Sequence, residues 1–263
     1  MLTILSPAKS LDMETKLETK NFSTTEFLSD SWELIQELRQ KSPNEISALM
    51  GISDNLGELN SERYLEWEKP TKIGPETRQA ILAFDGDVYK GMQAKEKFSE
   101  ADYEYSQVSL RILSGLHGLL KPLDLIRPYR LEMGTKVKIG SHNNLYQFWG
   151  HKINSAIETA VSESPGEKVL INLASNEYFK AAKPDDLAVD TISPRFLDSK
   201  DGGDYKIVSF FAKKARGSMA SWLITNRVEK VSNIKEFDGM GYSYSIKEST
   251  ELTPVFKREN RTN

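Results

Sequence analysis

The segment Val169-Leu170-Ile171-Asn172-Leu173 is an apolar run that ends in the small residues Ala174-Ser175-Asn176. Two earlier segments have the same form: Leu2-Thr3-Ile4-Leu5 ends at Ser6, and Arg111-Ile112-Leu113 ends at Ser114-Gly115. Short apolar runs bounded by turn residues are typical of strands that are buried on both faces of a sheet. The three segments therefore predict a sheet that is covered by helices.

The polar residues that follow these strands are candidates for one binding cleft. In mixed α/β folds, the loops after the carboxyl ends of strands are where ligands meet backbone amides and helix starts. The residues in these positions are Ser6, Lys9, Ser114, Ser175 and Asn176. The alternative is that they serve only as turn residues, which are often small and polar.

The first 110 residues predict mostly helices. Ser23 and Glu26 fit a capping box ahead of apolar residues at helical spacing. A second start signal has Ser42 as N-cap, with Pro43 and Glu45 at the first and third helical positions, and its helix ends near Gly51. Further helices are predicted over residues 54–67, 75–84 and 99–110.

The C-terminal third predicts further strands and one long helix. A strand is expected over residues 190–192, a strand over 205–211 that leads into a helix over 212–227, and a hairpin from 242–246 and 252–256. With no repeat and no linker-like segment, residues 1–256 predict a single domain of mixed α/β (α+β) class with a mixed sheet and an N-terminal helical region. Residues 257–263 are expected to be a frayed polar tail.

Composition excludes several classes of protein. The chain has 263 residues, 38% of them hydrophobic, and a formal charge of −3. Because it contains no cysteine, disulfides, thiolate zinc sites, iron–sulfur clusters and a cysteine nucleophile are excluded. No window approaches 18 uncharged apolar residues, and the N-terminus lacks the apolar core of a secretory signal. We therefore expect a cytoplasmic protein with no membrane partner, and we favour a monomer.

Positive charge is concentrated in two islands of this acidic chain. Residues 111–138 contain six cations against two carboxylates, and residues 206–216 contain four cations and no carboxylate. If both islands line one groove, a phosphate backbone would suit it. Arg127 and Arg130 flank Pro128-Tyr129, where a guanidinium beside an aromatic ring suits phosphate or base stacking. Solvated lysines on helix faces are the alternative.

Gly51-Ile52-Ser53 lies between two predicted helices and has features of a helix-hairpin-helix turn. Backbone amides at such a turn, with the next helix start, can hold one DNA phosphate without reading bases. Asp54 and Glu58 bring negative charge to the same place. The alternative is a helical corner whose apolar residues pack inward.

Metal and nucleotide motifs are weak or missing. Asp85 and Asp87 flank Gly86, so they are candidates for Mg²⁺ binding, but we favour a helix entry in which Asp87 is the N-cap. His117, His142 and His151 have no metal-ligand spacing, and no GxxxxGK[ST] or GxSxG motif occurs. We therefore expect no metal site and no cofactor.

The strand-to-helix segment Phe211-Ala212-Lys213-Lys214-Ala215-Arg216-Gly217 has three cations within four residues. Lys213 and Arg216 are three apart and share a helix face, whereas Lys214 points elsewhere. Clustered cations form an anion clamp or, if they are desolvated, a reactive lysine. The pattern leaves both open.

Seven blocks of this sequence together resemble the YaaA-type peroxide stress resistance proteins. They are Ser6-Pro7-Ala8-Lys9-Ser10-Leu11-Asp12, Phe84-Asp85-Gly86-Asp87-Val88-Tyr89, Arg111-Ile112-Leu113-Ser114-Gly115-Leu116, Pro122-Leu123-Asp124-Leu125-Ile126, Pro128-Tyr129-Arg130-Leu131-Glu132-Met133-Gly134-Thr135, Asn172-Leu173-Ala174-Ser175-Asn176-Glu177-Tyr178, and the Phe211 to Gly217 segment. The resemblance implies a cytoplasmic bacterial protein that limits free iron and oxidative damage, and that binds DNA through a helix-hairpin-helix element and a positive cleft on a mixed α/β fold.

Two functional hypotheses follow. The first is a protein that binds double-stranded DNA through its backbone phosphates, largely without sequence specificity. The phosphate-binding candidates are Lys9, Gly51, Ile52, Ser53, Arg111, Ser114, Arg127, Arg130, Asn176, Lys206, Lys213 and Arg216. The second is a glycosylase- or lyase-like enzyme acting on a nucleotide or nucleic acid, in which Lys9 or Lys213 is the cation or nucleophile and Asp87, Glu132 or Glu177 the acid or base.

Overall fold

A five-stranded mixed sheet forms the centre of the molecule in the computed structural model, which describes residues 1–200 and 202–260. The strand order is β6-β5-β1-β8-β9. Strands β5 (Leu110–Ser114), β1 (Leu2–Leu5), β8 (Leu170–Asn172) and β9 (Thr191–Ile192) are parallel, and β6 (Gly118–Leu120) pairs antiparallel with β5. The predicted mixed sheet and its three apolar strands are confirmed.

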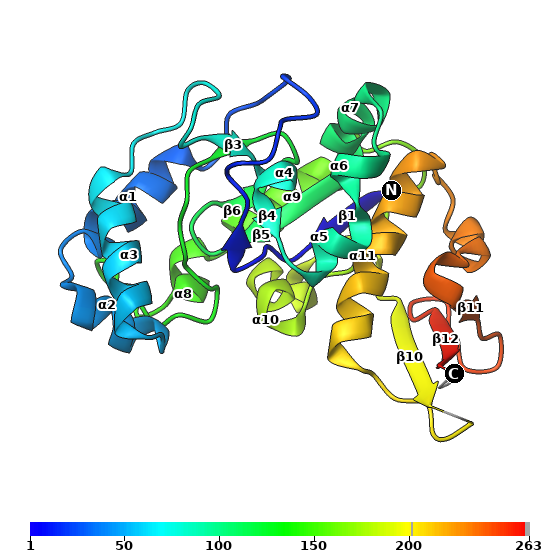
Figure 1. Cartoon of the computed structure of the whole chain (residues 1–263). Helices are drawn as coiled ribbons and strands as arrows, with labels where there is room; N and C mark the ends of the chain where they lie inside the picture. Colours follow the sequence, from blue (N-terminus) through cyan, green and yellow to red (C-terminus); the bar gives the residue numbers. More distant parts are fainter. Residues whose placement is uncertain (201, 261–263) are drawn as a thin grey trace.

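The sheet is buried because helices pack around it (Figure 1). Every residue of β1 and β5 is buried. Helices α7 (Glu100–Ser109), α9 (Lys152–Glu163) and α11 (Ser209–Thr225) contact its strands. One continuous core extends from Met1 to Phe256 and includes Met92, Met133 and Met219. The chain therefore folds as one compact domain.

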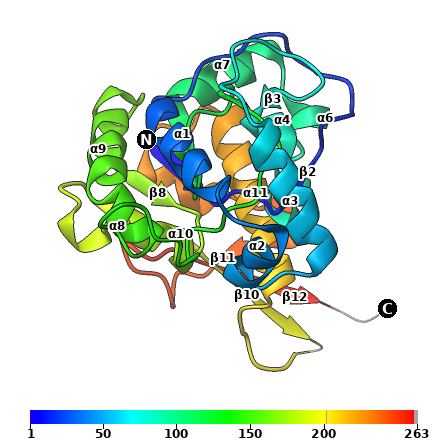
Figure 2. The same cartoon turned by 90° about the vertical axis from the view of Figure 1, so that its left-hand side faces the viewer.

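Helices α1 (Leu28–Leu38), α2 (Pro43–Met50) and α3 (Asp54–Glu66) lie together at one end of the molecule, which faces the viewer in Figure 2. The capping box at Ser42 is present, and Gly51 ends α2 in the left-handed conformation at φ 60°. Ser99 caps α7 in the same way as Ser42 caps α2. These start and stop signals were correctly predicted from sequence.

One predicted start signal and one predicted helix in this half are wrong. Ser23 does not cap a helix: its hydroxyl donates to Asp124, and α1 begins only at Leu28. Residues 75–84 do not form one helix, because their backbone pairs with distant segments. They contain β3 (Arg78–Gln79), α4 (Ala80–Ala83) and the start of β4 (Phe84–Asp85), and β3 pairs with β7 (Leu125–Ile126) while β4 pairs with β2 (Ser10–Leu11).

The C-terminal segments form a second, three-stranded sheet, seen at the lower right of Figure 1. Strand β12 (Val255–Asn260) lies between β10 (Arg195–Lys200), which is parallel to it, and β11 (Ser243–Tyr244), which is antiparallel. The predicted hairpin is thus present, and β12 continues past residue 256, where a polar tail was expected. The strand predicted over 205–211 is wrong, since α11 already begins at Ser209.

Short elements connect these layers. They are α5 (Asp87–Met92), α6 (Ala94–Lys97), α8 (Leu145–Trp149), α10 (Asn176–Phe179) and four 3₁₀ turns at Lys180–Ala182, Pro184–Asp186, Val231–Glu236 and Gly239–Gly241. None of the helices within residues 1–200 and 202–260 has the length and apolar character needed to cross a bilayer.

Candidate functional site

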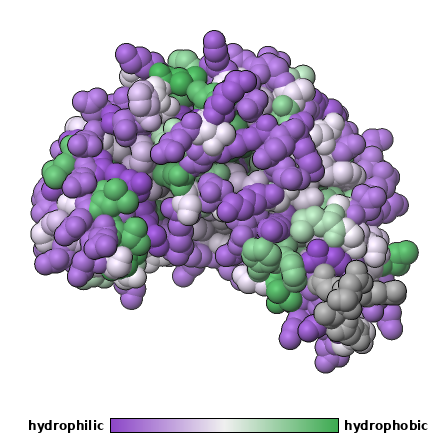
Figure 3. Space-filling view, viewed as in Figure 1, coloured by the Kyte–Doolittle hydropathy of each residue, from purple (hydrophilic) through white to green (hydrophobic). Residues whose placement is uncertain are grey.

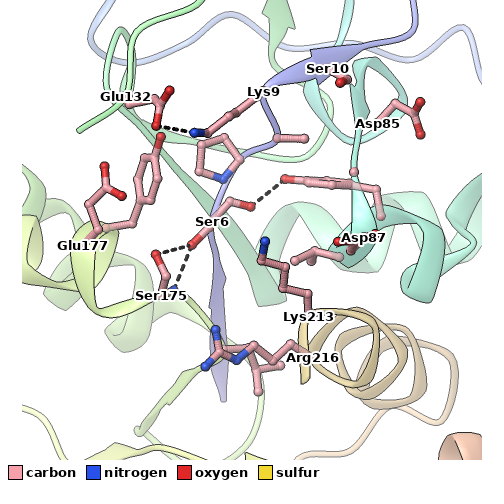
Figure 4. A pocket seen from close by; sticks show the side chains of 17 residues that line it. Ser6, Lys9, Ser10, Asp85, Asp87, Glu132, Ser175, Glu177, Lys213 and Arg216 are labelled. Atoms are coloured by element: carbon pink, nitrogen blue, oxygen red, sulfur yellow. Dashed lines mark hydrogen bonds and ion pairs between the residues drawn. The ribbon is translucent and has the colours of Figure 1, made fainter. Parts of the chain in front are cut away.

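A pocket of about 420 Å³ lies at the carboxyl ends of β1 and β8. Its lining comes from five separate segments, namely the loop after β1, the start of α5, Glu132, the β8–α10 loop and α11. In Figure 3 the mostly polar face of the molecule is hollowed near its middle, and Figure 4 shows the side chains inside. The parallel sheet predicts this location, because strand ends and helix starts meet there.

Two serine hydroxyls form the floor of the pocket. The backbone N–H of Ser175 donates to Ser6 Oγ at 2.9 Å, and Ser6 Oγ donates to Ser175 Oγ at 3.3 Å. The Tyr89 hydroxyl donates to the carbonyl of Ser6 at 3.1 Å. These bonds join the loop after β1 to the loop after β8. The two loops are neighbours because β1 and β8 are paired in parallel, so that their carboxyl ends lie side by side.

One wall is a chain of charged groups. Lys9 Nζ lies 2.7 Å from Glu132 Oε2, and Arg130 Nη2 donates to Glu132 Oε1 at 3.1 Å. The Lys9 side chain is 62% exposed, whereas that of Glu132 is only 25% exposed. Glu132 therefore holds Lys9 at the rim of the pocket, and Arg130 holds Glu132 from behind.

The facing wall is α11, from which Lys213 and Arg216 extend into the pocket (Figure 4). Neither side chain has a hydrogen-bond or ion-pair partner within residues 1–200 and 202–260. Partial burial lowers the pKa of the Arg216 guanidinium from its ordinary value. Two cations that form no ion pair in the described part of the chain, one of them partly desolvated, are suited to receive an anion.

Two glycines set the position of this wall. A Cβ on Gly217 of α11 would lie 1.7 Å from the carbonyl oxygen of Val88, and a Cβ on Gly91 of α5 would lie 2.0 Å from that of Lys214. The backbones of α5 and α11 are therefore in direct contact, which only glycine permits. This contact fixes the distance between Asp87, at the start of α5, and the cations of α11.

Carboxylates complete the lining. Asp85, Asp87, Glu132 and Glu177 face the pocket together with the three cations Lys9, Lys213 and Arg216. Glu177 accepts a hydrogen bond from the backbone N–H of Gly134 at 2.9 Å. The pocket thus has mixed charge, unlike the basic groove that two cationic islands would form. Such a lining can bind an anion at one wall and accept or transfer a proton at the other.

Among residues 1–200 and 202–260, no group of three or more His, Asp or Glu side chains is arranged to hold a metal ion. Asp85 and Asp87 line the pocket without a third ligand of this kind.

Two of the predicted phosphate contacts lie in the core instead. Arg111 is only 7% exposed, and its guanidinium donates to the carbonyls of Gln107 and Leu110 at 2.8 Å. Ser114 is fully buried and hydrogen-bonds the Tyr129 hydroxyl at 2.7 Å. Both belong to β5, whose residues are all buried, so neither side chain reaches the pocket.

Other predicted residues lie outside the pocket lining. The side chain of Arg127 is only 15% exposed and pairs with Glu68 at 3.6 Å, and the backbone of Lys206 pairs with Asp198 of β10. Asn176 lines a separate hollow with Lys180 and Lys183. Gly51, Ile52 and Ser53 form the turn between α2 and α3, at the end of the molecule opposite α11 (Figure 1).

Sequence reasoning missed the two tyrosines of the pocket. Tyr89 and Tyr178 both line it and are buried, and burial raises the pKa of each phenol well above its ordinary value. Both therefore stay neutral and offer ring surface and a hydroxyl. Each tyrosine belongs to one of the seven sequence blocks that resemble the family, and this was the sequence signal that could have identified them.

Comparisons with known proteins agree over nearly the whole chain. The family model described as peroxide stress protein YaaA matches residues 1–248. A UPF0246 protein from Aliivibrio fischeri (strain ATCC 700601 / ES114) is 50% identical over 261 residues, which cover 99% of each chain. A UPF0246 protein from Aliivibrio fischeri strain MJ11 is similar to the same extent.

Proposed function

The chain belongs to the family of the peroxide stress protein YaaA, and from this membership and the pocket we propose that it protects cells against peroxide by binding DNA. The binding uses backbone phosphates and is largely independent of sequence. We place the protein in the cytoplasm, and we propose that its action there lowers free iron and limits oxidative damage.

The observation that carries the DNA-binding proposal is the pair of unpartnered cations on α11. Lys213 and Arg216 lie on one helix face, line the pocket, and form no ion pair within residues 1–200 and 202–260. A phosphate oxygen can pair with them, and Arg binds phosphate with two parallel hydrogen bonds. Lys214 of the same helix does not line the pocket, and its Nζ lies 4.3 Å from the Phe210 ring centre.

A second phosphate contact is proposed at the turn between α2 and α3. The Gly51 and Ile52 N–H groups both donate to the carbonyl of Ser47, so they are not available to a ligand. The amides at the start of α3, from Ser53 onward, lack a side-chain cap and are the groups that would hold a phosphate.

Salt titration tests this function. Binding of a duplex of about 20 base pairs should weaken steeply with salt, because each phosphate contact releases counterions with a slope of about −0.9 in log K against log[salt]. Lys213→Gln combined with Arg216→Gln should make that slope shallower by about 2. Native and scrambled duplexes should behave alike. Fluorescence anisotropy at several salt concentrations measures the salt dependence, its change in the double variant, and the effect of the duplex sequence.

Lys247→Gln is the control, since Lys247 is exposed and does not line the pocket. A duplex affinity that does not change with salt, or that depends on sequence, would contradict the proposal. The proposed effect on iron is checked by electron paramagnetic resonance of chelated ferric iron in peroxide-treated cells. Cells with the double variant should contain as much free iron as cells without the protein.

A second candidate function is an enzyme acting on a nucleotide or nucleic acid. It is favoured by one arrangement, the presence of Lys213 in the same pocket as Asp87, Glu132 and Glu177. In that role the Lys213 amine attacks the anomeric carbon of the sugar, and the bond to the base breaks as the base takes a proton from a carboxylic acid. The bond between C1′ and O4′ then opens, O4′ takes the proton that the amine gives up, and a Schiff base remains.

Borohydride trapping tests the enzymatic candidate. A Schiff base between Lys213 and an abasic site would be reduced to a stable protein–DNA adduct, which denaturing gels detect. The adduct should be lost in Lys213→Gln and retained in Lys214→Gln. No adduct and no turnover with abasic, oxidised and undamaged duplexes would exclude this function while leaving DNA binding intact.

A further inference from the structure

The pocket opposes positive and negative walls, which restricts the kind of phosphate it can take. Lys213 and Arg216 provide two positive charges on α11, while Asp85, Asp87, Glu132 and Glu177 face them or lie beside them. A continuous strand carries a negative phosphate on every nucleotide. Phosphates that follow the first one would therefore approach carboxylates, which repel them.

We propose that this pocket binds the terminal phosphate monoester of a nucleotide, either at the end of a DNA strand or in a free nucleotide. This rests on the proposed binding of DNA by the same cations and names the part of the molecule that enters. The remaining phosphates of a duplex then contact the surface outside the pocket.

Charge complementarity favours a monoester over a diester. A phosphate monoester carries about −1.5 to −2 charges at pH 7, whereas each diester of the backbone carries −1. The unpartnered Lys213 and Arg216 offer two positive charges to one ligand group, because they are three residues apart on one helix face. The hydroxyl of Ser175 on the floor accepts from Ser6 and can donate its own proton to a further phosphate oxygen.

The size and the other walls of the pocket suit the rest of a nucleotide. Its volume of about 420 Å³ lies in the range of small-ligand sites. Tyr178 and Pro7 line it and offer apolar surface to a sugar or base. Asp87, a hydrogen-bond acceptor, can receive a sugar hydroxyl, and Glu132 holds Lys9 at the rim.

The test compares one duplex of about 12 base pairs with hydroxyl ends, 5′-phosphate ends or 3′-phosphate ends, each by fluorescence anisotropy. One phosphorylated form should bind at least about tenfold more tightly than the hydroxyl form, because its terminal phosphate forms charge-assisted hydrogen bonds. A tenfold change in affinity corresponds to about 1.4 kcal/mol. Lys213→Gln and Arg216→Gln should each reduce that preference to about one. Lys214→Gln, on the same helix but outside the pocket lining, should keep it.

Free ligands separate the two sources of the terminal phosphate. Deoxyadenosine monophosphate should remove the preference by competition, whereas deoxyadenosine should not. Equal binding of all three duplexes would overturn this inference and leave the proposed DNA binding standing. Binding of the free nucleotide with no binding of any duplex would instead overturn the DNA-binding function and support the pocket as a nucleotide site.

Discussion

His117 shows how strongly burial changes one side chain. Its ring is fully buried, and burial lowers its pKa from 6.5 to about 3. The Ser31 hydroxyl lies 3.0 Å from the carbonyl of Phe27 and 2.9 Å from His117 Nδ1. Since Ser31 has a single proton, which the Phe27 carbonyl accepts, Nδ1–H is assigned as the donor to Ser31 Oγ. The histidine is thus a neutral core group.

This burial predicts a pH dependence of stability. The unfolded chain binds a proton at His117 below about pH 6.5, whereas the folded chain does so only near pH 3. The free energy of unfolding should therefore fall as the pH drops below 6.5, by up to about 1.4 kcal/mol per pH unit from this residue. Urea denaturation at pH 7 and pH 5 measures it.

His117→Gln removes this proton and should reduce the loss of stability between pH 7 and pH 5 by about 2 kcal/mol. His151→Gln, at an exposed position, should retain the pH dependence of the unaltered protein. Identical pH dependence in the unaltered chain and His117→Gln would contradict the assignment of a buried neutral histidine.

The arginines show what sequence can and cannot predict at this scale. Arg111 and Arg216 both stand in basic islands, so composition treats them alike. Strand β5 is buried on both faces, so even its charged residue Arg111 lies in the core. There the guanidinium donates hydrogen bonds to two backbone carbonyls. Arg216 lies on a helix whose other side is buried, and the 3.6-residue period correctly places it beside Lys213.

At the scale of elements, the contact between α5 and α11 controls the pocket. Gly217→Ala would place a methyl group within 1.7 Å of the Val88 carbonyl, so the two helices must separate. We expect a loss of about 1–3 kcal/mol in the free energy of unfolding, as for other overpacked sites. The preference for phosphorylated duplex ends should fall as well, since Lys213 and Arg216 move away from Asp87.

Gly74→Ala is the matched control, because its added Cβ would lie at an ordinary distance of 3.4 Å from Thr77 Oγ1. It should leave both stability and binding nearly unchanged. Urea denaturation and anisotropy give the two readouts. Unchanged stability in Gly217→Ala would show that the helices do not pack through these glycines.

Strand β12 supports α11 from the far side. Arg258 of β12 pairs with Asp198 at 2.7 Å and stacks on the Phe211 ring at 4.5 Å, so it links the small sheet to the first turn of α11. Phe256 is fully buried against Phe196 and Phe237. The small sheet therefore holds the cation-bearing helix in place.

Phe256→Ala tests that support. Removing a fully buried ring should cost about 3–5 kcal/mol in the free energy of unfolding. Ile246→Ala, at a side chain that is 84% exposed, should change stability by less than about 0.5 kcal/mol. Thermal and urea denaturation compare the two, and equal stability would exclude a core role for the ring.

The elements that sequence predicted share a local signal. Capping residues and buried apolar runs are read from neighbouring positions, so α2, α7, β1, β5 and β8 are found correctly. The pairing of β10 with β12 joins segments about 60 residues apart and has no such signal. The pocket was predicted in part, because the strand ends bring Ser6 and Ser175 together. Ser114 was wrongly included: it belongs to the buried strand β5, and its hydroxyl is bonded to Tyr129, which is distant in sequence.

At the scale of the whole molecule, the two proposed phosphate contacts are far apart. The turn at Ser53 lies at one end and α11 toward the other (Figure 1). The intervening surface includes a groove lined by Asp12, Glu14, Glu62, Glu66 and Glu76, with Arg63 and Lys95. A duplex that touches both contacts must therefore be long, and it must avoid this acidic groove.

Ser53→Glu tests the distant contact. The added carboxylate should repel a phosphate at the start of α3, so affinity for a duplex of about 20 base pairs should fall about tenfold or more. Binding of deoxyadenosine monophosphate in the pocket should stay unchanged. Ser232→Glu is the control at another exposed serine. Equal duplex affinity in Ser53→Glu and the unaltered protein would remove the turn from the binding surface.

The burial of methionine in the core has a consequence for a protein of this family. With no thiol in the chain, thioether sulfur is the side-chain atom most readily attacked by oxidants. Within residues 1–200 and 202–260, Met1, Met92, Met133 and Met219 are buried, Met13 and Met50 are partly buried, and Met240 is the one methionine among the exposed large hydrophobic residues. Sulfoxide formation should therefore begin at Met240, which is not part of the core, and the fold should persist in the presence of peroxide.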